Sequence, residues 1–135
     1  FPATQSGSSD VNTLDDYEEV TWTPSVGGSA TYTAQGGAYT KIGRMVHISC
    51  TLVINVIGTG STTTISGLPF TAGNRATAAV YYTALSSSVT TMIGFIDSST
   101  TTIALRSSAA AATAVALTAV IDSGTTIYLS ATYNV

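Results

Sequence analysis

The sequence contains very little charge. Only 8% of its 135 residues are Asp, Glu, Lys or Arg, against about 25% in an average globular chain. Hydroxyl-bearing and small side chains take their place, and they keep a surface soluble less well than charges do. Large uncharged surfaces commonly mark contacts with other chains. We therefore expect oligomerisation to cover part of this surface.

Clusters of basic residues are also missing. The four cations are Lys41, Arg44, Arg75 and Arg106, whereas five of the seven acids share one ten-residue window: Asp10, Asp15, Asp16, Glu18 and Glu19. The net charge is -3. Because nucleic acids and anionic membranes bind to basic patches, we expect neither as a partner.

Cysteine pairs and long apolar runs are absent as well. The single Cys50 excludes an internal disulfide and a cysteine-based metal site. No apolar run reaches the roughly 18 residues that a membrane helix needs, and no secretory signal pattern opens the chain. We expect no membrane insertion. The first residue is not Met, and we interpret the chain as a fragment or a processed product.

The most prominent pattern in the sequence is the recurrence of apolar residues at every second position. Between residues 44 and 57, one face of a predicted strand carries Val46, Ile48, Cys50, Leu52, Ile54 and Val56. The other face is mixed and includes His47, which we expect to be partly buried or at a subunit contact. A strand of this length would extend roughly 45 Å. We expect it to bend or to contain a bulge.

Further short strands are predicted on both sides of this segment. They cover residues 30–34, 39–42, 62–66, 76–85, 89–96, 101–105 and 126–135, with a hairpin turn expected at Gln35-Gly36-Gly37. Residues 107–120 are rich in alanine, which favours helix, but their alternation favours strand. About eight strands and no helix predict an all-β antiparallel sandwich, jelly-roll-like. We expect an extended connector over residues 1–13 and one domain over residues 14–135.

Three segments resemble a known family. They are Asn12-Thr13-Leu14-Asp15-Asp16-Tyr17-Glu18-Glu19-Val20-Thr21-Trp22-Thr23-Pro24, then Tyr39-Thr40-Lys41-Ile42-Gly43-Arg44, then Ile65-Ser66-Gly67-Leu68-Pro69-Phe70. Together and in this order they look like the terminal domain of bacteriophage tail fibres and tailspikes. The likeness covers residues 1–71 closely. Val20 departs from it, since relatives usually carry Gly there.

The resemblance implies a β-sandwich assembled as a homotrimer. It implies a part of the virion tail, made in the host cytoplasm and acting outside the cell, that recognises a bacterial surface receptor such as a polysaccharide. It implies no catalytic machinery and no cofactor. The alternative is a purely structural domain that trimerises and caps a fibre, while other domains bind or hydrolyse polysaccharide.

The acidic segment has a physical interpretation of its own. Its carboxylates repel one another, and Lys41 and Arg44 are the cations expected to pair with one or two of them. A bidentate pair of Arg44 with Asp15 or Asp16 across a subunit boundary would fix the register between chains. The alternative is a solvated turn whose apolar members plug the end of the sandwich. The candidate assembly residues are Leu14, Asp15, Asp16, Tyr17, Glu18, Glu19, Trp22, Lys41 and Arg44.

Catalysis and metal binding are poorly supported. The paired carboxylates suggest a glycosidase, which needs two carboxyl groups about 5 to 10 Å apart, but a chain of thin strands offers no large groove. The only histidine, His47, has no partner at a suggestive spacing. The aspartates do not follow the pattern of a calcium loop. We expect no enzyme activity and no metal.

Sugar binding would use exposed aromatic rings together with amides and hydroxyls. The candidates are Tyr81, Tyr128, Asn74 and Arg75. Because Tyr81 and Tyr82 are neighbours in a predicted strand, they point to opposite faces. We expect one of them to lie in the core and the other to be exposed or at a subunit contact.

Overall fold

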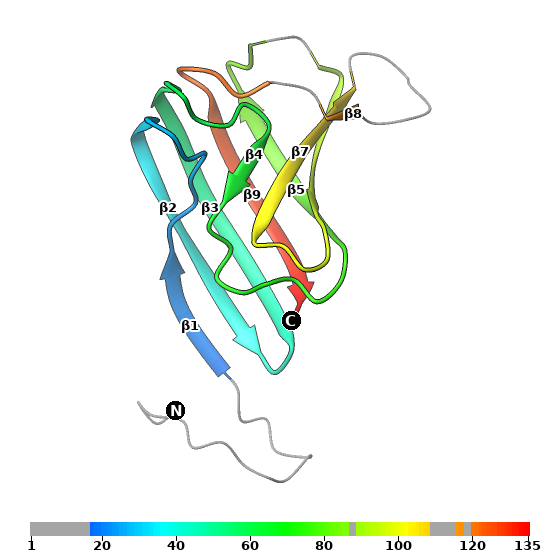
Figure 1. Cartoon of the computed structure of the whole chain (residues 1–135). Coiled ribbons are helices and arrows are strands. Elements are labelled where there is room, and N and C mark those ends of the chain that lie inside the picture. Colours follow the sequence, from blue (N-terminus) through cyan, green and yellow to red (C-terminus); the bar gives the residue numbers. More distant parts are fainter. Residues whose placement is uncertain (1–16, 87–88, 109–115, 118–119) are drawn as a thin grey trace, which may run out of the picture.

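The computed structural model describes residues 17–86, 89–108, 116–117 and 120–135. These residues form strands and no helix (Figure 1), so none of them belongs to a helix that could cross a membrane. The strands are β1 (Tyr17–Trp22), β2 (Thr31–Ile42), β3 (Met45–Val56), β4 (Thr64–Ser66), β5 (Ala76–Thr83), β6 (Thr91–Ile96), β7 (Thr102–Ser108), β8 (Ala116–Leu117) and β9 (Thr126–Asn134). The predicted all-β class is confirmed. The connector predicted over residues 1–13 lies outside the described residues.

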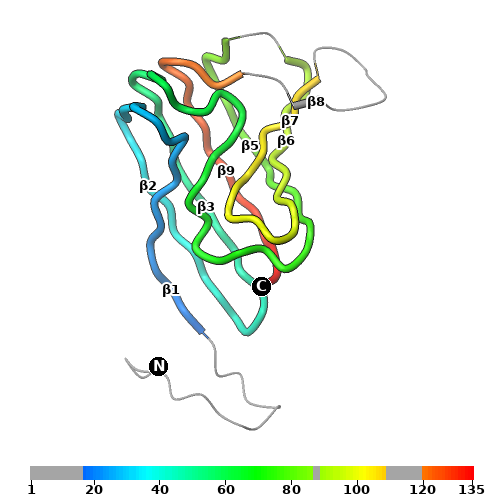
Figure 2. Tube along the Cα trace, in the orientation of Figure 1, coloured from blue at the N-terminus to red at the C-terminus, as the bar shows by residue number. Residues whose placement is uncertain are grey.

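One curled sheet contains all nine strands. Its order is β1-β2-β3-β9-β5-β6-β7-β4, with β8 beside β7, and every pair is antiparallel. The two ends of this order meet, because Ser25 and Ser66 exchange backbone hydrogen bonds of 3.0 and 2.7 Å. The sheet thus curls around its own core, as the trace in Figure 2 lets the reader follow. The separate two-sheet sandwich, the jelly roll and the trimer stay predictions.

Alternate residues of β3 and β9 form the centre of the core. The buried members are Val46, Ile48, Cys50, Leu52 and Ile54 on β3, and Ile127, Leu129, Ala131 and Tyr133 on β9. Each fully buried aliphatic side chain contributes about 1.5–3 kcal/mol by leaving water. The predicted apolar faces of both strands are therefore confirmed along most of their length.

Val56 is the exception on β3, because it is 49% exposed. The register between β2 and β3 shifts near Thr31 and Tyr32, opposite the end of β3, and the pairing of β3 with β9 stops at Val53. A register shift changes which face a residue points to. The prediction that Val56 belongs to the apolar face is wrong for this reason, while the predicted irregularity in the long strand is present at its end.

The turn predicted at Gln35-Gly36-Gly37 is wrong. Strand β2 runs through these residues without interruption. Gly37 lies where Trp22 packs, and a Cβ on Gly37 would come within 2.4 Å of the indole nitrogen. The same nitrogen donates a hydrogen bond of 3.1 Å to the Ser49 carbonyl. The glycine therefore admits an aromatic ring and does not turn the chain, which instead reverses at Gly43 with φ of 55°.

The remaining strands agree with the sequence in number and approximate place. Residues 62–66, 76–85, 89–96 and 101–105 contain β4, β5, β6 and β7, although β7 continues to Ser108. Within the alanine-rich stretch, Ala116–Leu117 forms the short β8 beside β7. Residues 109–115 and 118–119 of that stretch lie outside the described residues.

Substituting Gly37 tests the role of this position. We expect Gly37→Ala to lower the free energy of unfolding by about 1–3 kcal/mol, because the added methyl group overpacks against Trp22. Gly36→Ala is the matched control, since a Cβ there meets nothing within 4 Å, and it should be neutral or stabilising by roughly 0.5 kcal/mol. Urea titration followed by the fluorescence of Trp22 measures both. Equal losses at the two positions would contradict this explanation.

Candidate functional site

Residues of the three motif segments meet at one end of the sheet. Glu18 on β1 and Lys41 on β2 lie opposite each other in the strand register. The Tyr39 hydroxyl donates a hydrogen bond of 3.0 Å to Glu18 Oε2. Phe70 lies edge-on to Tyr39, with ring centroids 5.4 Å apart. Lys41 is buried, with Nζ 5.6 Å from the Phe70 centroid, a distance at which a cation is attracted to the ring.

Tyr133 of β9 connects this group to the core. Its hydroxyl donates to the Phe70 carbonyl at 3.1 Å and accepts from the Phe70 amide at 3.3 Å. Burial raises the pKa of Tyr133. The pKa of Tyr39 is also raised, mainly by partial burial and in second place by the hydrogen bond to Glu18. We call Glu18, Tyr39, Lys41, Phe70 and Tyr133 the motif cluster. Its contacts are internal, so it holds together segments that are distant in sequence.

The other candidate assembly residues are placed around the motif cluster. Trp22 is buried against Gly37, and the Tyr17 hydroxyl donates to the Glu19 carboxylate, which raises the pKa of Tyr17. Arg44 Nε donates to the Val135 carbonyl at 3.2 Å. Leu14, Asp15 and Asp16 lie outside the described residues, so the pairing of these acids with Arg44 stays a prediction.

Tyr81 and Tyr128 lie side by side on the outer face of the sheet. They are cross-strand partners on β5 and β9, 60% and 48% exposed. Their ring centroids are 5.7 Å apart and the ring planes differ by 31°. Tyr82 points the opposite way and packs against the core. The sequence therefore placed these tyrosines correctly relative to the core, and the fold brings two of the four candidate sugar-binding residues together.

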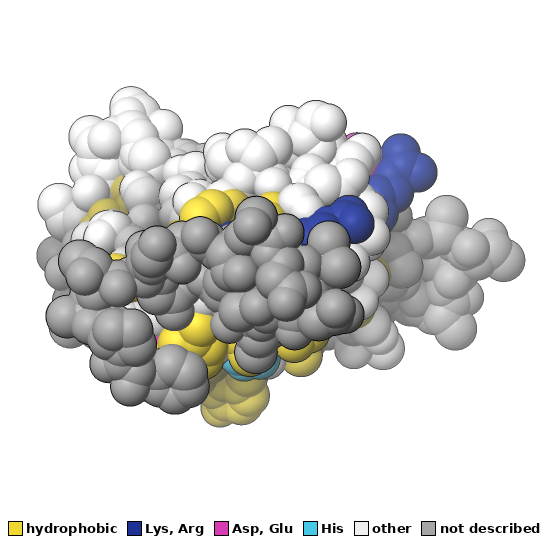
Figure 3. Space-filling model, turned by 90° about the horizontal axis from the view of Figure 1, so that it is seen from below, with side chains coloured by type: hydrophobic (Ala, Val, Ile, Leu, Met, Phe, Trp, Pro, Cys, Tyr) yellow, Lys and Arg dark blue, Asp and Glu magenta, His cyan; other side chains and the backbone are white. Residues whose placement is uncertain are grey.

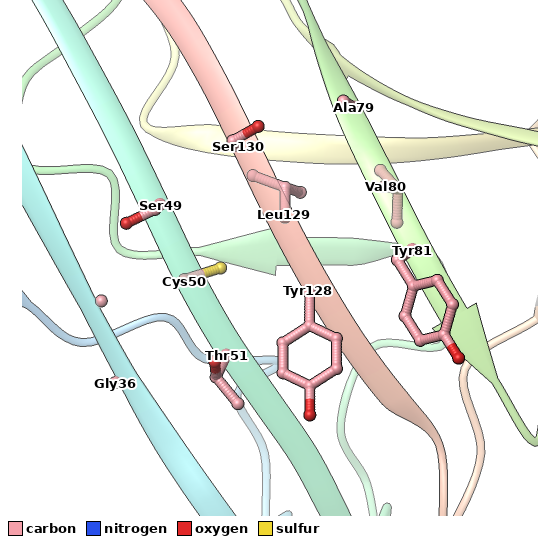
Figure 4. A pocket seen from close by; sticks show the side chains of 11 residues that line it. Gly36, Ser49, Cys50, Thr51, Ala79, Val80, Tyr81, Tyr128, Leu129 and Ser130 are labelled. Atoms are coloured by element: carbon pink, nitrogen blue, oxygen red, sulfur yellow. The ribbon is translucent and has the colours of Figure 1, made fainter.

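The pair stands beside an open hollow of about 690 Å³, which we call the tyrosine hollow (Figure 4). It arises because a row of small residues, Ser49, Ser130 and Ala79, lies next to a row of larger ones, Thr51, Tyr128 and Tyr81, across β3, β9 and β5. The full lining is Gly36, Gly37, Ser49, Cys50, Thr51, Ala79, Val80, Tyr81, Tyr128, Leu129 and Ser130.

The chemistry of the tyrosine hollow is that of aromatic faces and neutral hydroxyls. No described residue that lines it is charged. The hydroxyls of Ser49, Thr51, Tyr81, Tyr128 and Ser130 make no hydrogen bond to any described residue. Hydroxyls both donate and accept hydrogen bonds, and they remain available to a ligand. Aromatic rings offer flat apolar faces to the C–H groups of sugars.

Asn74 and Arg75 are not brought to this hollow. Arg75 precedes β5 and lies six residues from Tyr81, roughly 20 Å along the strand. Its Nε donates to Asp97 Oδ1 at 2.8 Å, and this bond lowers the pKa of Asp97. Of the four candidates, the two tyrosines therefore lie together, whereas Asn74 and Arg75 lie elsewhere, with Arg75 in an exposed ion pair.

The hydroxyl groups of the hollow were not among the residues predicted from the sequence. Alternation does place Ser49 and Thr51 opposite the core residues of β3, and Ser130 opposite those of β9. It does not reveal that β9 lies between β3 and β5, and this pairing is what creates the site. His47 lies on the same outer face, is exposed, and has Nδ1 3.0 Å from Thr132 Oγ1. It points away from the core, so of the two expectations for His47, partial burial within the chain is wrong and a place at a subunit contact stays a prediction.

Metal binding finds no support in the described part of the chain, where no three His, Cys, Asp or Glu residues form a group able to hold a metal ion.

Comparison with protein-family models, with curated proteins and with solved structures found no match to this chain. The candidate function therefore rests on the hollow and on the motif residues themselves.

Cys50 borders the hollow from the core side and is 7% exposed. Burial raises the pKa of its thiol from 9.0 to about 11, although a backbone hydrogen bond from Leu129 acts in the opposite direction. The folded protein therefore holds the thiol proton more tightly than the unfolded chain does. The resulting stabilisation is complete below pH 9 and is lost as the pH rises through 11.

We expect this thiol to make unfolding easier at high pH. Between pH 9 and 11 it should lower the free energy of unfolding by up to about 1.4 kcal/mol per pH unit, in addition to the effect of the tyrosines. In Cys50→Ala the decline should be shallower, although this variant is less stable at neutral pH because it leaves a small cavity. Urea titrations at several pH values give both slopes, and identical slopes would exclude the effect.

Proposed function

We propose that this chain is a non-catalytic domain from the distal end of a phage tail fibre or tailspike, which trimerises and recognises a bacterial surface polysaccharide. The observation that carries the recognition step is the pair of exposed tyrosine rings beside unpaired hydroxyls in the tyrosine hollow. Flat rings stack on sugar C–H faces, and hydroxyls satisfy the polar groups of a sugar. In this proposal the domain acts outside the cell as part of the virion.

The family part of the proposal rests on the motif residues. Segments around Glu18, Lys41 and Phe70 are separated by more than twenty residues in sequence, yet they meet in the motif cluster. Internal contacts of this kind support a role in folding for the motif. Receptor binding is assigned to the tyrosine hollow, on the outer face of the same sheet.

The absence of catalysis is part of the proposal. Glycoside hydrolysis uses two carboxyl groups on either side of the scissile bond. The described lining of the tyrosine hollow contains no Asp, Glu or His, while Glu18 and Glu19 accept hydrogen bonds from Tyr39 and Tyr17. A domain that holds a polysaccharide without cutting it agrees with this distribution.

Substituting the tyrosines tests receptor binding. We expect Tyr81→Ala and Tyr128→Ala each to weaken binding to host cells or purified host polysaccharide by roughly tenfold or more, because loss of one stacked ring removes about 1–3 kcal/mol. Both rings are exposed, so stability should change little. Binding is measured by titration calorimetry or by cell pull-down.

Asn74→Ala and Arg75→Ala are the controls for this experiment, because they alter the other predicted sugar-binding residues without touching the hollow. They should leave binding unchanged. Loss of binding in the controls but not in the tyrosine variants would move the site to the Arg75 loop. A stable trimer that binds no host surface would instead favour the alternative of a purely structural capping domain.

Trimerisation is supported by the low charge of the chain and by apolar residues on its surface. Val20, Met45 and Val56 are 51%, 46% and 49% exposed, and in the view from below the described surface is mostly white and yellow, with little blue or magenta (Figure 3). Such a surface suits contacts with other chains. Met45 and Val56 lie at opposite ends of β3, so the low charge of the surface, and not one apolar patch, carries this part of the proposal.

Sedimentation equilibrium tests the trimer. At micromolar concentration we expect a mass near three times the 13.7 kDa of one chain, because a trimer would cover the uncharged surface. Light scattering provides an independent mass. A species of 13.7 kDa at that concentration would overturn this part of the proposal.

A further inference from the structure

The tyrosine hollow has a lining without charged side chains among its described residues. Its described lining offers two aromatic faces, short hydroxyl side chains, Ala, Gly and buried core atoms, and no ionisable side chain other than the tyrosines and the buried Cys50. A carboxylate, sulfate or phosphate on a bound sugar would lose part of its hydration here. It would find hydroxyl donors but no cation in the described lining, so no ion pair would offset the hydration that the anion loses.

No basic side chain is positioned to compensate. All four cations are engaged elsewhere: Lys41 is buried beside Phe70, Arg44 bonds the Val135 carbonyl, Arg75 pairs with Asp97, and Arg106 lies 5.0 Å from the Phe95 centroid. None of them lines the tyrosine hollow. The residues outside the described ranges contain no Lys or Arg in their sequence, so they add no basic side chain either.

The overall charge acts in the same direction. Among the described residues, four acidic side chains balance the four basic ones, so they present no net positive charge that would attract a polyanion. Recognition of an acidic capsule would instead require a basic groove, because charge complementarity governs both encounter and selectivity. The hydroxyls of Ser49, Thr51 and Ser130 beside the two tyrosines suit the hydroxyls of an uncharged sugar.

We infer that the ligand of the tyrosine hollow is an uncharged saccharide, built of neutral hexoses or their N-acetyl derivatives, and that acidic glycans are rejected. This inference rests on the proposed function, since it names the class of polysaccharide that the same site binds. Binding through stacking and neutral hydrogen bonds should be nearly independent of salt, because no ion pair is screened.

A glycan array printed with neutral bacterial oligosaccharides and with uronate-containing and phosphorylated ones tests the inference on the full chain. We expect binding to neutral members only. Their affinity should change less than about twofold between 50 and 500 mM salt, and Tyr128→Ala should weaken binding by roughly tenfold or more. Preferential binding to acidic members, or a tenfold loss of affinity with salt, would overturn the inference and leave receptor recognition standing. No binding to either class would overturn both.

A charge-insertion variant gives a second readout on the same array. Ser49→Lys places a cation at the edge of the tyrosine hollow, and Ser49→Gln is the control of similar length without charge. We expect Ser49→Lys, but not Ser49→Gln, to acquire salt-sensitive binding to acidic members. If the unsubstituted chain already binds acidic glycans as well as Ser49→Lys does, the hollow does not select against charge, and the inference fails.

Discussion

The register of β9 is the constraint on which both the core and the tyrosine hollow depend. This strand pairs with β3 from Val53↔Thr126 to Met45↔Asn134 and with β5 from Thr83↔Thr126 to Ala78↔Ala131. Because side chains alternate across a strand, a slip of one residue would exchange its two faces. Leu129 would then point outward and Tyr128 into the core. The burial of Ile127, Leu129 and Tyr133 fixes the register, and the outer face follows from it.

The same strand connects two regions with different roles. Near its end, Tyr133 bonds both backbone groups of Phe70 and so holds the motif cluster to the core. Near its middle, Tyr128 stands beside Tyr81 on the outer face. A buried tyrosine hydroxyl satisfies polar groups that would be costly to leave unpaired, whereas an exposed tyrosine leaves its ring to a ligand. Burial therefore distinguishes the two tyrosines of one strand: Tyr133 is buried in the motif cluster, and Tyr128 keeps its ring exposed on the outer face.

Local patterns in the sequence predicted the parts of the fold that depend on alternation. They located β3 and β9, their buried faces, and the opposite orientations of Tyr81 and Tyr82. They failed where the environment of a residue depends on a segment distant in sequence. Gly37 was predicted to lie in a turn because the packing of Trp22 on it is not visible in the local pattern, and Val56 was predicted to lie in the core because the shift in register is not visible either. The tyrosine hollow also depends on segments that are distant in sequence. Its hydroxyls come from strands whose adjacency no local pattern encodes.

The scarcity of charge, which first indicates self-association, also bears on how the hollow can achieve selectivity. Serine and threonine lose little side-chain entropy on binding, and a tyrosine has only two rotatable side-chain bonds, so a face built from them is already ordered. The paired sheet beneath holds these groups at fixed spacing, and such preorganisation lowers the entropic cost of binding. Lysine and arginine would bring stronger bonds but also greater mobility and attraction to any polyanion. Under the proposed function, a neutral, rigid face would instead discriminate by the positions of its hydroxyls and rings, which is the form of recognition that an uncharged sugar permits.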